Sequence, residues 1–121
     1  MNPAVWAGVV VIGGCGAVLR FLVDGAVSTR TGRSFPYGTL TVNLSGAAVL
    51  GLLTGLALSR DATLLAGTAA VGSYTTFSTW MFETQRLAED RQVRYLAANL
   101  AVSLVAGVAA AALGWWIGAT L

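Results

Sequence analysis

The sequence predicts an all-α integral membrane protein with four transmembrane helices, the third of which is broken. Of the 121 residues, 56% are hydrophobic and 10% are charged, and the 15 glycines are spread through apolar stretches. This composition is typical of a chain that folds in a bilayer. Because the length suits one domain, we expect residues 1–121 to form a single four-span membrane domain.

Four windows are apolar over the length of a membrane span, which needs roughly 20 residues. They cover residues 4–23, 37–58, 63–82 and 95–121. The windows lack the alternating pattern of barrel strands, and backbone polar groups inside a bilayer must be bonded internally. We therefore expect helices. The first window has no basic segment before it, so it is kept as part of the mature fold rather than as a signal peptide.

Small residues recur at spacings that allow helices to pack closely. Gly13 and Ala17 lie four residues apart in the first window, and Gly46, Gly51 and Gly55 lie in the second. Small side chains let helix backbones approach each other. The pattern predicts tight helix packing, either within one chain or between two copies.

The charges predict an orientation in the plasma or inner membrane. All seven basic residues are arginine, and Arg20 lies inside the first window. In a four-span chain both termini and the second loop lie on one side, which carries only Arg60. The first and third loops lie on the other side and carry five arginines: Arg30, Arg33, Arg86, Arg91 and Arg94. The positive-inside tendency makes the five-arginine side cytoplasmic and places both termini outside.

Several classes of function are disfavoured by composition. The arginines are not clustered as a nucleic-acid groove would require, so we expect no nucleic-acid partner. The chain has no histidine and a single cysteine, Cys15, which lies in an apolar stretch. Triad and metal-assisted catalysis therefore lack their usual side chains, and we do not expect an enzyme.

A polar run from Gly72 to Thr79 lies inside the third window. Flexible Gly72 followed by β-branched Thr75 and Thr76 disfavours a continuous helix there. A broken span would free backbone carbonyls and amides, which bilayer-spanning proteins use to bind ions. The alternative is a continuous helix whose Ser and Thr hydroxyls bond to the preceding turn. Composition alone leaves both open.

Other polar residues lie within the remaining windows. Asn43 is in the second, and Asn99 and Ser103 are one helical turn apart in the fourth. Such residues either link helices by hydrogen bonds or offer donors to an anion. Arg20 and Asp24, four apart, could pair, or Arg20 could mark a water-filled vestibule that gathers anions.

No carboxylate lies near the centre of any window, so the intramembrane polar groups are mainly hydroxyls and amides. Hydrogen-bond donors without a nearby carboxylate suit an anion better than a cation. Aromatic rings carry positive edges, so Phe77 and Trp80 could also contact an anion edge-on. Packing is the alternative role for these two rings.

These motifs resemble the CrcB/Fluc fluoride channel family. The resemblance is carried by four blocks, which are Gly13 to Arg20, Pro36 to Leu40 with Val42 to Leu44 and Gly46, Thr75 to Thr79 with Glu83, and Tyr95 at the fourth window. It implies a fluoride-selective channel that passively exports cytoplasmic fluoride and lowers its toxicity. It also implies an antiparallel, dual-topology dimer with two pores, each lined by both subunits.

The resemblance implies roles for individual residues. The fluoride pathway would comprise Asn43, Phe77, Ser78, Thr79, Trp80, Asn99 and Ser103. Arg20 would lie at a vestibule, and the backbone carbonyls of Gly72 and Thr75 would hold a structural, non-transported sodium ion at the dimer centre. The chain departs from the family pattern in having Trp80 in place of Phe, Asn99 in place of Ser and Ser73 in place of Gly.

Two other functions are consistent with a small four-span chain. A dual-topology multidrug exporter would need a carboxylate within the first span, and Asp24 lies too near the loop. A non-transporting scaffold would leave the broken span unexplained. The second subunit of a dimer could be an identical copy or a paired homologous chain, since five arginines against one favour a single direction of insertion.

Overall fold

The computed structural model describes residues 2–121, which contain helices and turns but no strand. The elements in chain order are α1 (Pro3–Thr31), α2 (Tyr37–Leu56), α3 (Arg60–Ala62), η1 (Thr63–Val71), α4 (Gly72–Tyr74), α5 (Ser78–Glu89) and α6 (Val93–Thr120). Three of them, α1, α2 and α6, are long and apolar enough to cross a membrane. They correspond to the first, second and fourth predicted windows.

Helix α1 is longer than the window that predicted it. It begins after Asn2, whose side-chain oxygen accepts a hydrogen bond from the N–H of Ala4 at 2.7 Å. It continues to Thr31 and ends at Gly32, whose φ of 76° is one that glycine adopts without strain. At 1.5 Å per residue the helix is about 43 Å long, so it extends beyond the hydrocarbon core of a bilayer.

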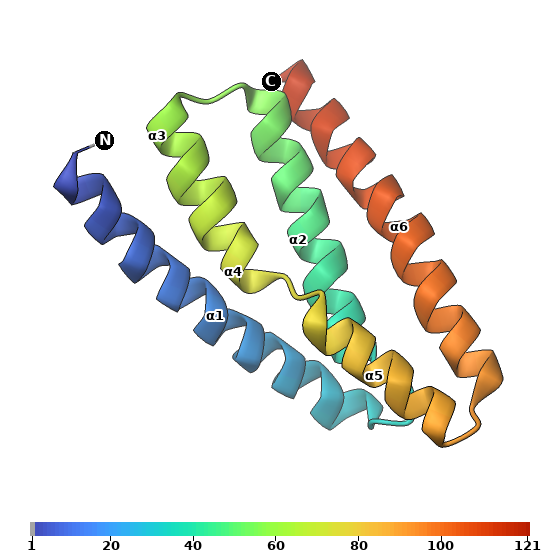
Figure 1. Ribbon diagram of the computed structural model, residues 1–121. Helices are drawn as coiled ribbons and strands as arrows, with labels where there is room; N and C mark the ends of the chain where they lie inside the picture. Colours follow the sequence, from blue (N-terminus) through green and yellow to red (C-terminus); the bar gives the residue numbers. More distant parts are fainter. Residues whose placement is uncertain (1) are drawn as a thin grey trace.

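The third predicted window is a broken helix, and the continuous-helix alternative is wrong. Helices α3, η1 and α4 follow one another without interruption up to Tyr74. Residues 75–77 then leave the helix, and α5 begins in a new direction (Figure 1). Gly72 itself is helical, with φ −61° and ψ −36°, whereas Thr75 is extended. The break therefore lies three residues after the glycine that was expected to cause it.

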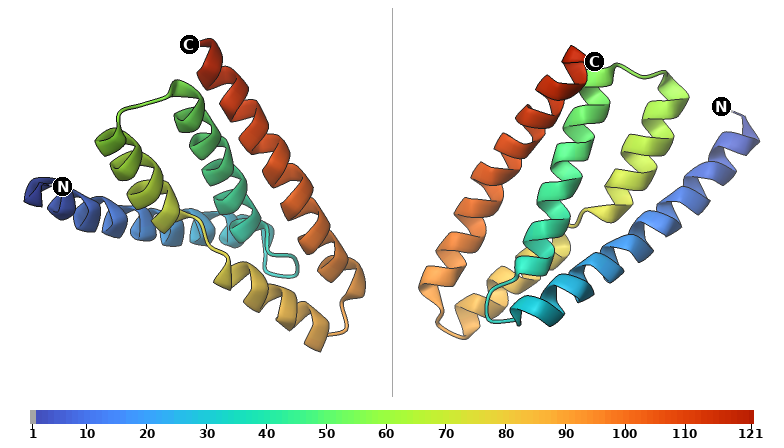
Figure 2. Two further views of the ribbon diagram at one scale, coloured as in Figure 1. Left: turned by 45° about the horizontal axis from the view of Figure 1, so that its top comes forward. Right: turned by 180° about the vertical axis from the view of Figure 1, so that it is seen from behind.

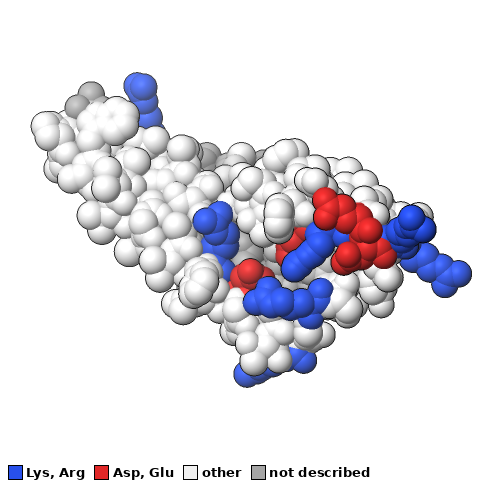
Figure 3. Space-filling model, turned by 60° about the horizontal axis from the view of Figure 1, so that its bottom comes forward, with Lys and Arg blue, Asp and Glu red and all other residues white. Residues whose placement is uncertain are grey.

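The chain crosses back and forth between two ends. Both termini and the α2–α3 turn lie at one end, and the α1–α2 and α5–α6 loops lie at the other (Figure 1). Seen from that second end, arginine side chains project beside a group of acidic ones (Figure 3). Arg60, in α3, is at the opposite end with the termini. This arrangement matches the division of arginines on which the predicted orientation rests.

Helices α2 and α6 pack with their backbones almost in contact (Figure 2). A Cβ atom at Gly51 would overlap the carbonyl of Ala111, and one at Gly114 would overlap the carbonyl of Ala48. Only glycine fits at such positions, because any side chain would push the helices apart. The predicted tight packing is confirmed within one chain for this pair.

Helix α1 packs against η1 and α4 by the same means. A Cβ at Gly13 would come within 3.2 Å of the Ser73 hydroxyl oxygen, and one at Gly16 would meet the carbonyl of Ala70. Ser73 is helical and lies against Gly13 and Gly16 of α1. Much of the outer surface is apolar, with Val10, Phe21 and Val105 each more than 70% exposed. Such a surface suits lipid or another membrane helix.

Candidate functional site

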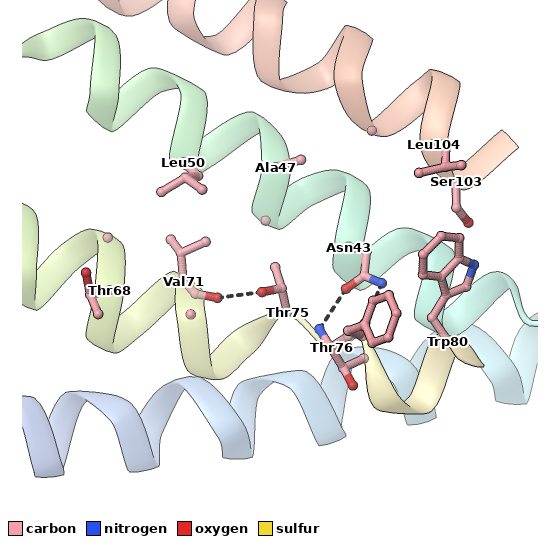
Figure 4. A pocket seen from close by; sticks show the side chains of 15 residues that line it. Asn43, Ala47, Leu50, Thr68, Val71, Thr75, Thr76, Trp80, Ser103 and Leu104 are labelled. Carbon is pink, nitrogen blue, oxygen red and sulfur yellow. Dashed lines mark hydrogen bonds between the residues drawn. The ribbon is translucent and has the colours of Figure 1, made fainter. Parts of the chain in front are cut away.

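The break is held by the side-chain amide of Asn43, 33 residues earlier in the chain (Figure 4). Its Nδ2 donates to the carbonyl of Thr76, and its Oδ1 accepts from the N–H of Thr76, both at 2.8 Å. Thr76 is only 8% exposed, so these groups would otherwise be buried without partners. Asn43 thus stabilises the non-helical segment, and one of its two amide hydrogens is left for another acceptor.

The start of α5 faces the break. The Thr76 hydroxyl oxygen accepts a hydrogen bond from the N–H of Thr79 at 3.1 Å. Within residues 2–121 the N–H groups of Ser78 and Trp80 have no acceptor. A helix N-terminus carries partial positive charge and free N–H donors, which favour an anion. The break therefore presents donors deep in the predicted third span.

A groove of about 530 Å³ runs along the break, between α2, η1, α4 and α6 (Figure 4). Four of the seven residues predicted for a fluoride pathway line it, namely Asn43, Phe77, Trp80 and Ser103. None of its 15 lining residues is acidic or basic. We call this the break groove. Its polar groups are amides, hydroxyls and backbone atoms, as the sequence predicted for the membrane interior.

Two aromatic rings in contact with each other line the break groove. The ring centroids of Phe77 and Trp80 are 5.7 Å apart and the planes are inclined at 80°, an edge-to-face arrangement. Phe77 is 70% exposed. The Trp80 indole N–H donates to the backbone carbonyl of Asn99 at 3.1 Å, so it is already occupied within the chain. A ligand here would meet ring edges rather than that N–H.

Asn99 does not lie on the break groove with four of the other residues predicted for the fluoride pathway. It is 1% exposed, does not line the break groove, and donates from Nδ2 to the hydroxyl of Thr84 at 2.9 Å. This is the interhelical hydrogen bond that was the alternative for a polar residue on the last span. Thr84 was not anticipated. Its position four residues after Trp80, on the same face of α5, was the available signal.

A second, smaller cavity of about 230 Å³ lies on the other side of the break. Arg20, Asp24 and Thr79 line it, and Thr76 lines both cavities. The vestibule role of Arg20 stays a prediction, and Thr79 lies with Arg20 rather than in the break groove. Ser78 is exposed and lines neither of these two cavities.

The possible ion pair between Arg20 and Asp24 is absent. Within residues 2–121 no arginine lies within 4.0 Å of a carboxylate as a salt bridge, and Asp24 instead accepts a hydrogen bond from the Ser28 hydroxyl at 3.1 Å. Asp24 also lies directly over Gly38, where a Cβ would overlap its carboxylate. Packing against Ser28 and Gly38 therefore places the Asp24 carboxylate at the contact between α1 and α2, although Asp24 and Arg20 both line the smaller cavity.

Glu83 belongs to the motif quoted above, but no role was predicted for it. Its Oε1 is buried and has no hydrogen-bond partner within residues 2–121. The hydroxyl of Thr39, which is 1% exposed and lines the Arg20 cavity, lies beside the same carboxyl group. A carboxylate placed just beyond the predicted third span is thus held next to the cavity that contains Arg20.

The carbonyls expected to hold sodium lie at the break. Gly72 and Thr75 both line the break groove, and within residues 2–121 neither carbonyl accepts a hydrogen bond. The Thr75 hydroxyl bonds to the carbonyl of Val71 at 3.1 Å, so it is used within its own turn. Free carbonyl oxygens are the ligands that hard cations take. The donor set fits such an ion, although one chain supplies only two of these oxygens.

The sequence matches a known family along almost its whole length. The model for CrcB-like protein, Camphor Resistance (CrcB), aligns with residues 7–115. The chain belongs to the CrcB family. Among curated relatives of this CrcB family member, a protein of Mycobacterium bovis named fluoride-specific ion channel FluC 2 is 67% identical over 117 residues. The alignment covers 97% of this chain and 93% of that relative.

Other CrcB relatives carry similar names. The fluoride-specific ion channel FluC 2 of Mycolicibacterium paratuberculosis is 69% identical over 111 residues, covering 92% of this chain and 91% of the relative. FluC 1 of Leifsonia xyli subsp. xyli is 41% identical over 122 residues, covering 98% and 89%. The CrcB family is thus one of ion channels rather than enzymes. With its apolar helices, this chain is a multi-pass cell-membrane protein.

Proposed function

We propose that this chain is a subunit of a fluoride-selective channel that passively exports fluoride from the cytoplasm. The observation that carries the proposal is the break groove, a membrane-depth site with hydrogen-bond donors and no acidic lining residue. The names of the CrcB relatives support the choice of fluoride. Neither a multidrug exporter nor a scaffold receives similar support.

Conduction requires that the pore replace the water held tightly by fluoride, yet bind weakly enough for release. The free amide hydrogen of Asn43 on α2 and the Ser103 hydroxyl on α6 are donors that line the break groove. The edge-to-face pair of Phe77 and Trp80 adds positive ring edges. The N–H groups at the start of α5 add partial positive charge. These donors suit a small anion. In this proposal the pore is too narrow for the larger halides.

Arg20 is proposed to gather anions from solution. It lines the second cavity without forming a salt bridge within residues 2–121, so its charge acts on ions near the cavity, where Asp24, which lines the same cavity, opposes it in part. Thr79 shares that cavity and Thr76 connects it to the break groove. In this proposal the hydroxyls of Ser78 and Thr79 assist the ion between the vestibule and the aromatic pair.

The channel is proposed to be an antiparallel dimer with two pores, in which a second subunit covers the open side of the break groove. The partner is an identical copy or a paired homologous chain. The exposed apolar surface and the exposed ring of Phe77 support coverage by a partner. Two subunits would bring the Gly72 and Thr75 carbonyls together as four oxygens. A structural sodium ion held there would neutralise their repulsion and join the two breaks.

Removing sodium should weaken the dimer. We expect the protein purified in N-methyl-D-glucamine chloride to melt at a lower temperature than in sodium chloride, and to dissociate at a higher protein concentration, because binding to the assembled state alone stabilises that state. Potassium chloride at the same ionic strength is the control for screening. Equal melting temperatures and equal dimer fractions in all three salts, after extensive dialysis, would contradict the sodium proposal.

The proposed function is tested by reconstitution. Liposomes loaded with potassium fluoride and containing the purified chain should release fluoride when valinomycin is added, as measured with a fluoride electrode. Passive export needs no nucleotide or proton gradient, so none is supplied. Release from the chain alone would identify a homodimer, and release only after adding a paired homologous chain would identify a heterodimer. No release under either condition would reject the channel.

A further inference from the structure

Three residues of α5 and α6 form a closed set of hydrogen bonds beside the break groove. The Trp80 indole N–H donates to the Asn99 carbonyl at 3.1 Å, and the Asn99 amide donates to the Thr84 hydroxyl at 2.9 Å. The Thr84 hydroxyl in turn donates to the Trp80 carbonyl at 2.8 Å. Each residue therefore gives one hydrogen bond and receives one. We call this the Trp80–Thr84–Asn99 ring.

The Trp80–Thr84–Asn99 ring is partly shielded from water, so its hydrogen bonds restrict the orientation of the Trp80 side chain. Asn99 is 1% exposed, and Trp80 and Thr84 are both half-buried. Hydrogen bonds away from water are electrostatically stronger, and breaking one leaves a buried polar group unpaired. The indole N–H of Trp80 is thus held by the Asn99 carbonyl of α6, and the backbone carbonyl of Trp80 is held by the Thr84 hydroxyl. Rotation of the Trp80 indole would break at least one of these hydrogen bonds.

Fixing the indole also fixes the aromatic pair. Trp80 meets Phe77 at 80° and lines the break groove, whereas Asn99 does not line it. Ser103, one turn further along α6, does. Asn99 and Ser103 therefore have different surroundings, since Asn99 bonds to α5 and Ser103 lines the groove.

We infer that Asn99 and Thr84 are positioning residues, which hold the Trp80 ring edge in the orientation that the proposed ion path requires. Asn99 then acts through Trp80 and does not contact the ion, in contrast to the pathway role expected from the sequence. The inference rests on the proposed function for its flux consequences, but the orientation of Trp80 can be measured independently.

The test combines a double-mutant cycle with a spectroscopic signal. Thr84→Val keeps the side-chain shape and removes the hydroxyl, and Asn99→Leu removes the amide. We expect each to reduce fluoride flux about tenfold when residue 80 is Trp, and less than about twofold in the Trp80→Phe background, where there is no indole N–H to position. Gln85→Met, which removes an exposed amide on the same helix, is the matched control and should leave flux unchanged.

The spectroscopic arm uses Trp80 as the only tryptophan, with Trp6, Trp115 and Trp116 changed to Phe. Thr84→Val in this protein should shift the emission maximum and lower the fluorescence anisotropy, whereas Gln85→Met should change neither. Thr84→Val decides the matter alone if Asn99→Leu does not give a monodisperse protein. Equal flux losses in both backgrounds, or an unchanged emission and anisotropy, would overturn the inference. If the unmutated protein shows no fluoride flux but Thr84→Val changes the fluorescence of the single-tryptophan protein, the channel proposal is rejected and the positioning of Trp80 by Thr84 still holds.

Discussion

Asn43→Ala is expected to abolish fluoride flux and to lower the free energy of unfolding by about 2–5 kcal/mol, because two buried hydrogen bonds are lost together. Both bonds join its amide to the backbone of Thr76. Without them the Thr76 N–H and carbonyl are left buried, and the segment at residues 75–77 loses the contact that holds it out of a helix. Fluoride efflux and thermal melting of the purified protein measure the two effects.

The matched control for this change is Thr41→Ala. Thr41 is an exposed polar residue on the same helix, and its hydroxyl bonds only within that helix, to the carbonyl of Tyr37 at 2.8 Å. It should leave both flux and melting temperature near their starting values. Wild-type flux in Asn43→Ala would show that the break does not depend on this amide and that Asn43 is not a pore donor.

Gly114→Ala is expected to prevent correct folding, since the added methyl group would overlap the Ala48 carbonyl on α2. Backbone cannot yield as a flexible side chain can, so the two helices must separate along their closest contact. Overpacking of this kind typically costs about 1–3 kcal/mol, and the rigid contact places this change at or above the upper end. The expected result is loss of the monodisperse peak in size-exclusion chromatography or a large fall in melting temperature.

Gly25→Ala provides the comparison, because no atom lies within 4 Å of the position that its Cβ would take. Alanine is also the better helix former, so this change should be neutral or slightly stabilising. If both alanine variants melt at the wild-type temperature, the close approach of α2 and α6 is not present in the folded protein.

The helices were predictable because hydropathy over a span length is a local property. The windows located α1, α2 and α6, and the main error was at the C-terminal end of α1, which continues past the window to Thr31 and stops at Gly32. The small-residue spacing also anticipated close packing. It did not say that Gly51 would meet Ala111 on α6, since partner choice depends on the topology.

The position of the break could be predicted only approximately. Helix propensity pointed to Gly72, yet Gly72 is helical and the chain leaves the helix at Thr75. The deciding contact is made by Asn43, on another span, and such a long-range pairing has no signature in local sequence. A glycine is tolerated inside a helix when tertiary contacts favour the helical conformation.

The candidate site was divided differently from the sequence-based expectation. A four-residue spacing allowed Arg20 to pair with Asp24, but Asp24 bonds to Ser28 at the same spacing in the other direction. The same spacing put Asn99 and Ser103 on one face, but only Ser103 reaches the break groove. Spacing identifies which partners are possible, and packing decides between them.

The central claim is selective passage of fluoride, and comparative efflux tests it most directly. Liposomes containing the chain, together with its paired subunit if one is needed, would be loaded with equal concentrations of fluoride and chloride and followed with two ion-selective electrodes after valinomycin is added. The account predicts that fluoride is released while chloride is retained. Equal release of the two halides, or release of neither, would contradict it.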